Sequence, residues 1–260
     1  MGEIRVERGG GVGVLEIAQA DRHNALTLAM WRDLGARARE LADDPDVRVI
    51  VVQGAGDAAF SAGADISEFA EVRSTHEAAA AYSEAVGSAL DALSRCRTPT
   101  VARLHGICVG GGAGIAVACA IRLADDRLRF AIPAARLGVV YEFEAIQRLV
   151  EVVGSSLALD VLASGRTLDA AEALRVGLVS QVVPREELDG LVAGYAARVA
   201  ENAPIPIEGA WVAIRAAREP WQPAWVEELE RLKRRAIESE DYAEGVRAFL
   251  EKRPPRFTGR

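Results

Sequence analysis

The stretch from Leu104 to Cys119 constrains the fold most, because it contains three consecutive glycines, Gly110 to Gly112. A run that favours β structure, Pro99 to Leu104, leads into this glycine turn, and an apolar helix is expected directly after it. Glycine permits positive φ angles and lets another group approach the backbone closely. Amides at the start of a helix lack a partner within the helix and favour negative charge. The stretch therefore predicts either a main-chain anion site or a turn that serves only close packing.

A second turn of the same kind lies earlier in the chain. The apolar run Val47 to Val52 is typical of a strand buried on both faces, and the small-residue segment Gly54 to Ile66 follows it. Asp65 is placed to cap a short helix after this turn. If the two turns lie side by side, they can present two amides to one oxygen atom.

The segments around these turns alternate between strand and helix patterns, which is typical of βα-type units. Thr27 is expected to cap the first long helix, and the sequence Ser74 to Glu77 resembles a capping box. Thr167 and Asp169 are expected to cap a short helix. The expected strands are 4–8, 12–17, 122–126, 128–132 and 178–183, and the expected helices are 26–41, 74–93, 145–153, 156–163 and 170–175.

The last part of the chain has no convincing strand pattern. Two prolines in the segment Ala203 to Pro206 predict a hinge, so we divide the chain into a core of residues 1–202 and a helical region of residues 203–260. Val226, Leu229 and Leu232 mark an apolar stripe on one tail helix, and 246–250 carries another. Such stripes need a surface to cover them, either in the same chain or on a neighbouring subunit.

Composition excludes several classes of function. The net charge of −7 argues against nucleic acid as the main partner. Three cysteines without a CxxC pair and three histidines form no zinc pattern, and an odd number of thiols suits a reducing cytoplasm. The first residues lack the apolar core of a signal peptide, and no apolar run reaches membrane-spanning length. We therefore expect a cytoplasmic protein with no metal site and no membrane partner.

Common catalytic motifs are absent from the sequence. The dinucleotide pattern that could start at Gly110 fails at Ile115, no lysine follows a glycine run, and neither G-x-S-x-G nor HExxH occurs. What remains is the pair of turns with free amides, which is a device for stabilising a developing oxyanion.

Several sequence blocks resemble the enoyl-CoA hydratase/isomerase (crotonase) superfamily. The two main blocks are Phe60 to Ile66 and His105 to Gly114, and the resemblance extends over essentially the whole chain in the order of the family. Further matching segments are 23–26, 147–149, 167–179 and 249–257.

This resemblance implies a fold, a ligand and a set of site residues. The fold would be α/β, a crotonase-like spiral of ββα repeats with a helical C-terminal region used in trimerisation, as a homotrimer or as a hexamer of paired trimers. The ligand would be an acyl-CoA thioester, with coenzyme A as part of the substrate and no other cofactor. By analogy, the amides of Ala64 and Gly111 would hold the thioester oxygen as an enolate-like anion. The resemblance places Leu26, Ala62, Asp65 and Ile66 along the coenzyme A path, with Arg22 and Arg256 near its phosphates.

The sequence departs from the hydratases at two positions. Hydration of an enoyl thioester uses two carboxylates, and the hydratases carry glutamates where this chain has Gly114 and Ala134. Neither residue can carry a proton, so the two-glutamate mechanism is not open to this chain.

Three interpretations follow from this departure. In the first, another carboxylate moves protons on the same enolate, as in an isomerase or a non-standard hydratase or lyase. Glu142 lies where related dienoyl-CoA isomerases place an aspartate, and Tyr141 where decarboxylases of the family place a tyrosine, although Glu142 and Glu144 could simply favour a helix N-terminus. The second is decarboxylation of a malonyl-type CoA thioester, and the third is a non-catalytic acyl-CoA-binding homologue.

Overall fold

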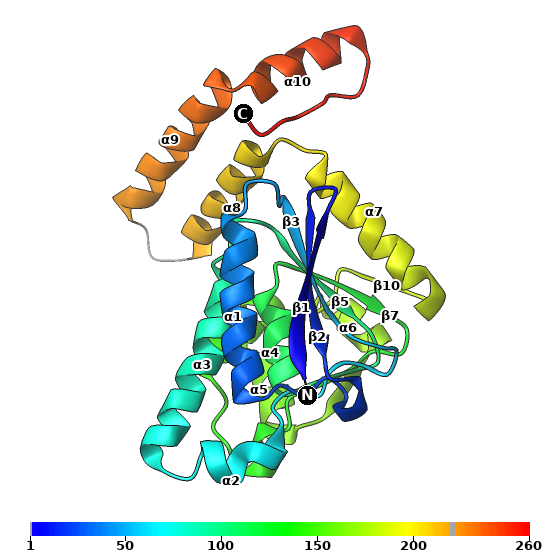
Figure 1. Cartoon of the computed structure of the whole chain (residues 1–260), viewed down its shortest axis with the longest axis vertical. Helices are drawn as coiled ribbons and strands as arrows, with labels where there is room; N and C mark the ends of the chain where they lie inside the picture. Colours follow the sequence, from blue (N-terminus) through cyan, green and yellow to red (C-terminus); the bar gives the residue numbers. More distant parts are fainter. Residues whose placement is uncertain (1, 219–221) are drawn as a thin grey trace. The chain divides into compact units, whose positions relative to one another are not determined.

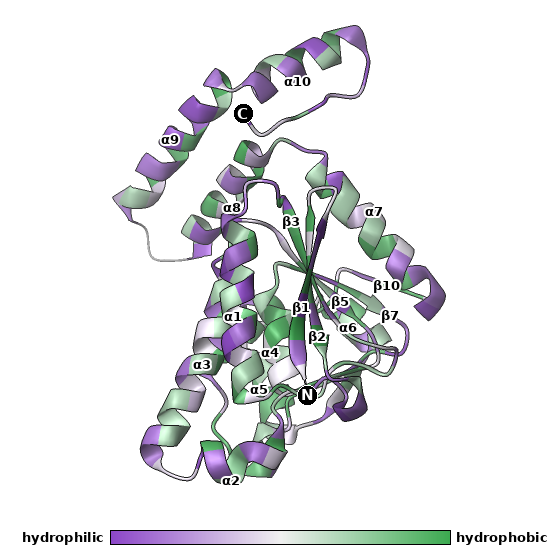
Figure 2. Cartoon of the chain, in the orientation of Figure 1, coloured by the Kyte–Doolittle hydropathy of each residue, from purple (hydrophilic) through white to green (hydrophobic). Residues whose placement is uncertain are grey.

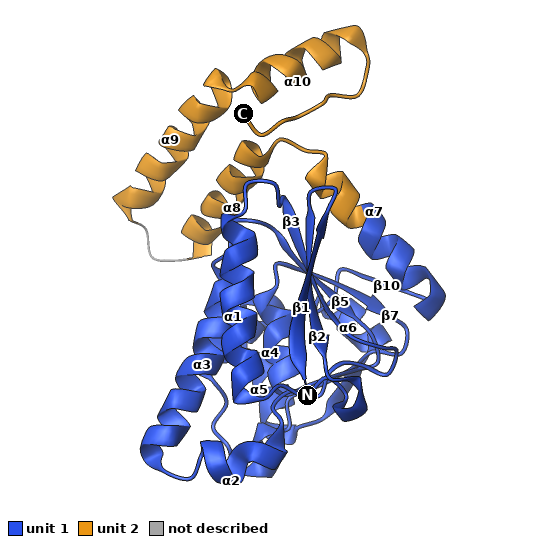
Figure 3. Cartoon of the chain, in the orientation of Figure 1, with its two compact units in different colours: residues 1–194 blue, residues 195–260 orange. Residues whose placement is uncertain are grey.

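The computed structural model describes residues 2–218 and 222–260. The chain divides into two compact units, Met1–Gly194 and Tyr195–Arg260 (Figure 3). The boundary predicted after residue 202 therefore falls inside the second unit.

The first unit contains two sheets in which most neighbouring strands are parallel. Figure 1 labels the strands of the larger sheet. The six-stranded sheet has the order β1-β2-β3-β5-β7-β10, and only the hairpin β1-β2 is antiparallel. The four-stranded sheet has the order β4-β6-β8-β9, with β8 and β9 antiparallel. The strands are β1 (Glu3–Gly9), β2 (Val12–Ala18), β3 (Val49–Gly54), β4 (Ala59–Ser61), β5 (Thr100–Leu104), β6 (Ile107–Val109), β7 (Ile121–Asp125), β8 (Arg129–Ala131), β9 (Thr167–Asp169) and β10 (Gln181–Val183).

From β3 to β8, consecutive strands alternate between the two sheets, and each pair of strands precedes a helix. One repeat is β3-β4 followed by α3 (His76–Ser94), the next is β5-β6 followed by α4 (Gly111–Ala118), and a third is β7-β8 followed by α5 (Phe143–Ser164). The expected spiral of ββα repeats is therefore confirmed. The remaining helices of this unit are α1 (Leu28–Asp43), α2 (Phe69–Val72) and α6 (Ala170–Arg175), with short 3₁₀ turns η1 (Ala20–Arg22), η2 (Ile66–Glu68), η3 (Ala134–Leu137) and η4 (Arg185–Glu187).

Side-chain caps start several of these helices. The Thr27 hydroxyl accepts a hydrogen bond from the Met30 amide at 3.2 Å, and Thr75 accepts one from Ala78 at 3.1 Å. The Asp65 carboxylate accepts one from the Ser67 amide at the start of η2. The Thr27 and Asp65 caps are as predicted, whereas the capping box expected at Ser74 is displaced by one residue, because Thr75 is the N-cap of α3.

Apolar residues of the strands and helices form one continuous core in the first unit. Strand β3 is buried along almost its whole length, and Figure 2 shows it mostly in hydrophobic colours. Helices α1 and α3 pack together so closely that a Cβ atom at Gly35 would lie 3.2 Å from the Ala89 backbone. This layer of helices and the sheets behind it form the scaffold of the site.

Three sequence predictions were wrong in detail. The glycine turn does not pass directly from strand to helix, because β6 lies between Gly106 and Gly110, which both have positive φ. The residues of β4 were predicted as part of a turn. Thr167 begins β9, and Asp169 alone caps α6. The missed strands have three residues each and are held by pairing with distant segments, so local sequence gives little sign of them.

The second unit consists of helices. Helix α7 (Leu188–Ala200) crosses into it and α8 (Pro204–Arg218), α9 (Pro223–Glu238) and α10 (Glu240–Glu251) follow. Ile205, Val212 and Leu232 form a small core of their own. The chain end is held on α10, because the Asp241 carboxylate accepts hydrogen bonds from the amides of Thr258 and Gly259 at 2.7 and 2.9 Å.

No helix in the described part of the chain is both long and apolar enough to cross a membrane.

Candidate active site

The two small-residue turns meet at the end of the four-stranded sheet. Parallel pairing of β4 with β6 brings the residues after each strand together. Gly63 has a φ of +93°, and a Cβ atom placed on it would lie only 2.6 Å from the Gly111 amide nitrogen. The close approach and the positive φ both require glycine at this position.

The Ala64 amide is directed by the pairing of its neighbours. Leu26 pairs with Ala64 through an isolated parallel bridge, in which the Leu26 amide donates to the Gly63 carbonyl at 2.7 Å and the Asp65 amide donates to the Leu26 carbonyl at 2.8 Å. Because successive amides of an extended chain point in opposite directions, the Ala64 amide points away from Leu26. Within the described residues it has no hydrogen-bond acceptor.

The Gly111 amide belongs to the first turn of α4 and therefore has no partner within that helix. Gly110, with a φ of +55°, turns the chain into the helix. A Cβ atom at Gly111 would lie 3.4 Å from the Ala64 nitrogen and 2.7 Å from Cζ2 of Trp31. The two unpaired amides are thus neighbours, as the sequence suggested, and Trp31 packs against one side of them.

A cavity of about 410 Å³ opens beside these amides. Most of its walls are apolar, which favours an acyl chain, and a few polar groups converge on it. The lining residues used below are Trp31, Ala62, Ala64, Ile66, Phe69, Arg73, Tyr82, Gly111, Ala134, Arg136, Tyr141 and Glu142.

Glu142 is the one carboxyl group among the described residues that line this cavity. It stands at the N-cap position of α5, where its backbone carbonyl accepts from the Ile146 amide but its side chain makes no capping hydrogen bond. Its Oε1 instead accepts a hydrogen bond from the Ser83 hydroxyl at 2.9 Å. Burial raises the pKa of Glu142, while the Ser83 hydrogen bond and the charge of Arg73 oppose that rise. A half-buried carboxyl with a raised pKa is suited to receiving and returning a proton.

Tyr141 lies next to Glu142 but is already engaged. Its hydroxyl donates a hydrogen bond to the Gly110 carbonyl at 2.7 Å, and burial raises its pKa far above the ordinary value. The neutral phenol therefore supports the glycine turn that presents the Gly111 amide.

The positions that carry glutamate in hydratases contain no acid here. Ala134 lines the cavity on η3. Gly114 is buried in α4, and a Cβ atom there would lie 3.0 Å from the Tyr141 hydroxyl. Tyr141 thus fills the space into which a side chain at residue 114 would begin to extend.

The residues predicted along the coenzyme A path divide into two groups. Ala62 and Ile66 line the cavity, and Ile66 is 56% exposed. Leu26 and Asp65 do not line it: Leu26 is fully buried, and Asp65 pairs with Arg22 at 2.8 Å. The hydrogen bond from the Ser67 side chain lowers the Asp65 pKa, with Arg22 contributing in the same direction. Arg256 lies in the second unit and is exposed.

Sequence reasoning missed the aromatic and cationic wall of the cavity. Tyr82 is buried and its hydroxyl accepts a hydrogen bond from Nε1 of Trp31 at 3.1 Å. Arg73 lies over the rings of both Tyr82 and Phe69. No motif marks these residues, because tertiary packing alone brings them to one place.

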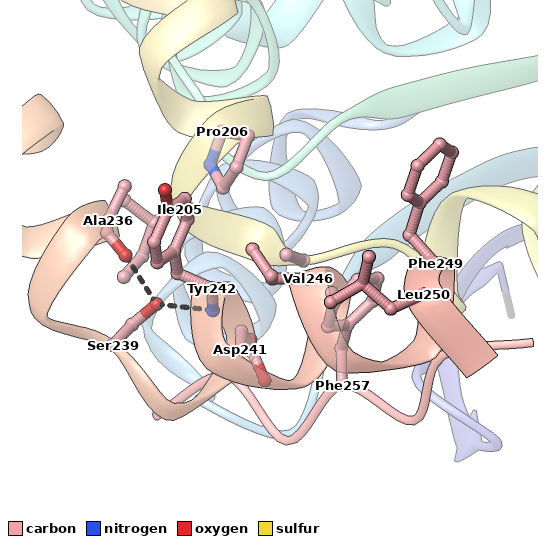
Figure 4. A pocket seen from close by; sticks show the side chains of 12 residues that line it. Ile205, Pro206, Ala236, Ser239, Asp241, Tyr242, Val246, Phe249, Leu250 and Phe257 are labelled. Atoms are coloured by element: carbon pink, nitrogen blue, oxygen red, sulfur yellow. Dashed lines mark hydrogen bonds between the residues drawn. The ribbon is translucent and has the colours of Figure 1, made fainter.

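A second hollow, in the helical unit, has a different character (Figure 4). Its walls are almost entirely apolar. Figure 4 shows Tyr242, Val246, Phe249 and Leu250 following one another along α10, and Phe249 and Leu250 are 84% and 74% exposed. The one carboxylate in its described lining, Asp241, is bound to the amides of Thr258 and Gly259, so this hollow has the properties of a contact surface.

Comparisons with known proteins agree with the geometry of the first unit. The sequence matches the enoyl-CoA hydratase/isomerase family over residues 7–260. It is 36% identical over 257 residues to a Mycobacterium tuberculosis protein named as a probable enoyl-CoA hydratase, covering 99% of this chain and 98% of that protein. The crystal structure of an enoyl-CoA hydratase/carnithine racemase from Magnetospirillum magneticum superposes with a TM-score of 0.93 at 35% identity, covering 100% of this chain and 97% of that one. The chain therefore belongs to the enoyl-CoA hydratase/isomerase (crotonase) family and is an acyl-CoA enzyme of that family.

Proposed function

We propose that this enzyme isomerises an unsaturated acyl-CoA thioester, with the Ala64 and Gly111 amides as the oxyanion hole and Glu142 as the proton carrier. The observation that supports this most strongly is the single carboxyl group in the cavity beside the paired amides. One base suffices to move a double bond, because the same carboxylate can take a proton at one carbon and return it at another.

The proposed step balances without a co-reactant. The Glu142 carboxylate removes the α-proton of a β,γ-unsaturated thioester, and the electron pair of that C–H bond moves into a dienolate. The two amides stabilise the charge that develops on the thioester oxygen. The protonated Glu142 then returns its proton at the γ-carbon, which gives the α,β-unsaturated thioester and restores the carboxylate.

Hydration and decarboxylation make different demands on the cavity. Hydration uses a second carboxylate to manage water, and the cavity supplies none from its described lining. Decarboxylation of a malonyl-type thioester needs the oxyanion hole but no base. A non-catalytic homologue would bind the acyl-CoA and would need no proton carrier.

Turnover of 3-enoyl-CoA thioesters, including trans-3-hexenoyl-CoA, tests the proposal. The conjugated product is followed by its absorbance, and incorporation of deuterium from D₂O reports proton exchange. We expect Glu142→Gln to lower kcat by about 10²- to 10⁴-fold. Glu144→Gln is the matched control, because Glu144 is next but one in sequence, packs beside Gly87 of α3 and does not line the cavity.

Other outcomes identify the alternatives. Equal isomerisation by wild type and Glu142→Gln would contradict the assignment of the base. Release of CO₂ from malonyl-CoA that survives Glu142→Gln would indicate a decarboxylase. Saturable acyl-CoA binding without turnover of any thioester would indicate a binding protein.

We also propose that the enzyme works in the cytoplasm as a homotrimer or a hexamer of paired trimers. Its three cysteines are all buried free thiols, which supports a reducing compartment. The exposed apolar side chains of α10 support a contact between copies of the chain.

A further inference from the structure

Arg73 is a cationic group in the cavity wall that is held between two aromatic rings. Its guanidinium carbon lies 4.5 Å from the ring centroid of Phe69 and 4.5 Å from that of Tyr82. The two rings are themselves arranged edge to face, with centroids 5.7 Å apart. Cation–π contacts of this kind hold a guanidinium in place without neutralising its charge.

Arg73 forms no ion pair in the described part of the chain, although its charge acts on the Glu142 carboxyl in the same cavity. Its Nε atom is buried and has no hydrogen-bond partner, and no carboxylate lies within ion-pair distance. Arg22, Arg103 and Arg127 each pair with an aspartate. A buried donor without an acceptor costs about 1–3 kcal/mol, and more when the group is charged. The arrangement around Arg73 therefore favours an anionic ligand.

The position of Arg73 indicates which part of an acyl-CoA would meet it. Arg73 stacks on Tyr82, the Tyr82 hydroxyl is bonded to Trp31, and Trp31 abuts Gly111. Two side chains thus connect the guanidinium to the proposed oxyanion hole within one cavity. The phosphates of coenzyme A are separated from the thioester by the whole pantetheine arm. The acyl group begins at the thioester and is the part that reaches Arg73.

We propose that Arg73 binds a carboxylate at the far end of the acyl group, so that the substrate is the CoA monothioester of a dicarboxylic acid. This inference rests on the proposed function of the same cavity and adds the substrate class. Guanidinium is well matched to carboxylate, because its planar donors form two parallel hydrogen bonds with the two oxygens. A malonyl-type carboxylate is disfavoured as the partner, since ion pairing with Arg73 would stabilise the group that has to leave.

Binding of saturated thioesters tests this inference without requiring turnover. Hexanoyl-CoA and adipoyl-CoA have the same chain length and differ only at the terminal carbon. Calorimetric titration of the wild-type protein is expected to show adipoyl-CoA binding about 10- to 100-fold more tightly than hexanoyl-CoA. A series from succinyl-CoA to pimeloyl-CoA then finds the chain length that reaches Arg73.

Variants of two cavity arginines provide the control. We expect Arg73→Met to abolish the preference for adipoyl-CoA while hexanoyl-CoA affinity stays unchanged, and Arg73→Lys to retain part of the preference. Arg136→Met is the matched control for Arg73→Met. Arg136 also lines the cavity, but it is exposed and donates a hydrogen bond to the Ser164 carbonyl. This control variant should keep the wild-type preference, and circular dichroism checks that each variant is folded.

The outcomes separate this inference from the proposed function. Equal wild-type affinity for hexanoyl-CoA and adipoyl-CoA would overturn the role of Arg73 and leave the acyl-CoA site intact. The role of Arg73 would also be overturned if Arg73→Met weakened the binding of hexanoyl-CoA and adipoyl-CoA equally. Failure of the wild type to bind any acyl-CoA would instead overturn the proposed function itself.

Discussion

His105 is a fully buried histidine at the end of β5, and its Nδ1 lies 2.9 Å from a guanidinium nitrogen of Arg103. Arg103 carries a positive charge, so the neutral imidazole accepts this hydrogen bond at Nδ1. Burial, reinforced by the charge of Arg103, lowers the His105 pKa to about 4, while Asp125 acts in the opposite direction. The histidine is thus neutral in the folded protein near neutral pH and serves as a structural acceptor.

This shift predicts how stability depends on pH. Below its ordinary pKa of 6.5, His105 gains a proton in the unfolded chain but not in the folded one until the pH falls to about 4. Its contribution to the free energy of unfolding is present above pH 6.5 and declines as the pH falls toward 4, by on the order of 3 kcal/mol in total. Urea unfolding of wild type and His105→Gln across this range checks it, because the variant should lack this component. Parallel pH profiles for the two proteins would contradict the prediction.

Among the elements, those with a signal in the local sequence could be predicted, and the shortest strands, which lack such a signal, could not. The Thr27 and Asp65 caps follow from hydrogen bonds that their side chains accept from amides two or three residues away. Strands β4 and β6 have only three residues each and are paired with each other, with an irregular register between Ala59 and Ser61.

The same distinction applies to the candidate site. A pair of turns with free amides could be predicted, because a glycine turn before a helix carries its own signature, and the family resemblance then points to Ala64 and Gly111. Arg73 could not be, because its place in the cavity depends on two rings from separate parts of the chain, Phe69 of α2 and Tyr82 of α3. Nothing in its sequence neighbours distinguishes it from a solvated surface arginine.

The contact between the two turns can be tested through Gly63. Its φ of +93° is strained for an L-residue, and a Cβ atom would lie 2.6 Å from the Gly111 nitrogen and 2.7 Å from the Val109 carbonyl oxygen. We expect Gly63→Ala to lower the free energy of unfolding by about 1–3 kcal/mol and to push the two turns apart. Thioester turnover should then fall far more than the folded fraction does.

Gly10→Ala is the matched control for this substitution. Gly10 also has a positive φ, of +59°, but no atom lies within 4 Å of a Cβ placed there. It should show the backbone strain in urea unfolding without loss of turnover. If Gly63→Ala retains full turnover, the two turns do not form one functional unit.

At the scale of the whole molecule, the two units differ in the cavities and side chains that they present. The first contains the cavity and every polar group of the proposed reaction. The second has a small core and exposes large apolar side chains on α10, including Phe249 and Leu250. A folded protein exposes a continuous apolar patch mainly where another surface covers it. Because homo-oligomers are usually symmetric, a second copy of this chain is the partner we propose.

Sedimentation equilibrium at micromolar concentration tests this assembly. The wild-type chain is expected to sediment with three or six times the mass of one chain. Phe249→Glu and Leu250→Glu should each shift the distribution toward smaller species, because a charge buried at an apolar contact is costly. Leu159→Glu is the control, since Leu159 of α5 is 67% exposed and belongs to the first unit. A monomeric wild type, or α10 variants with unchanged mass and native circular dichroism, would show that this face does not join copies of the chain.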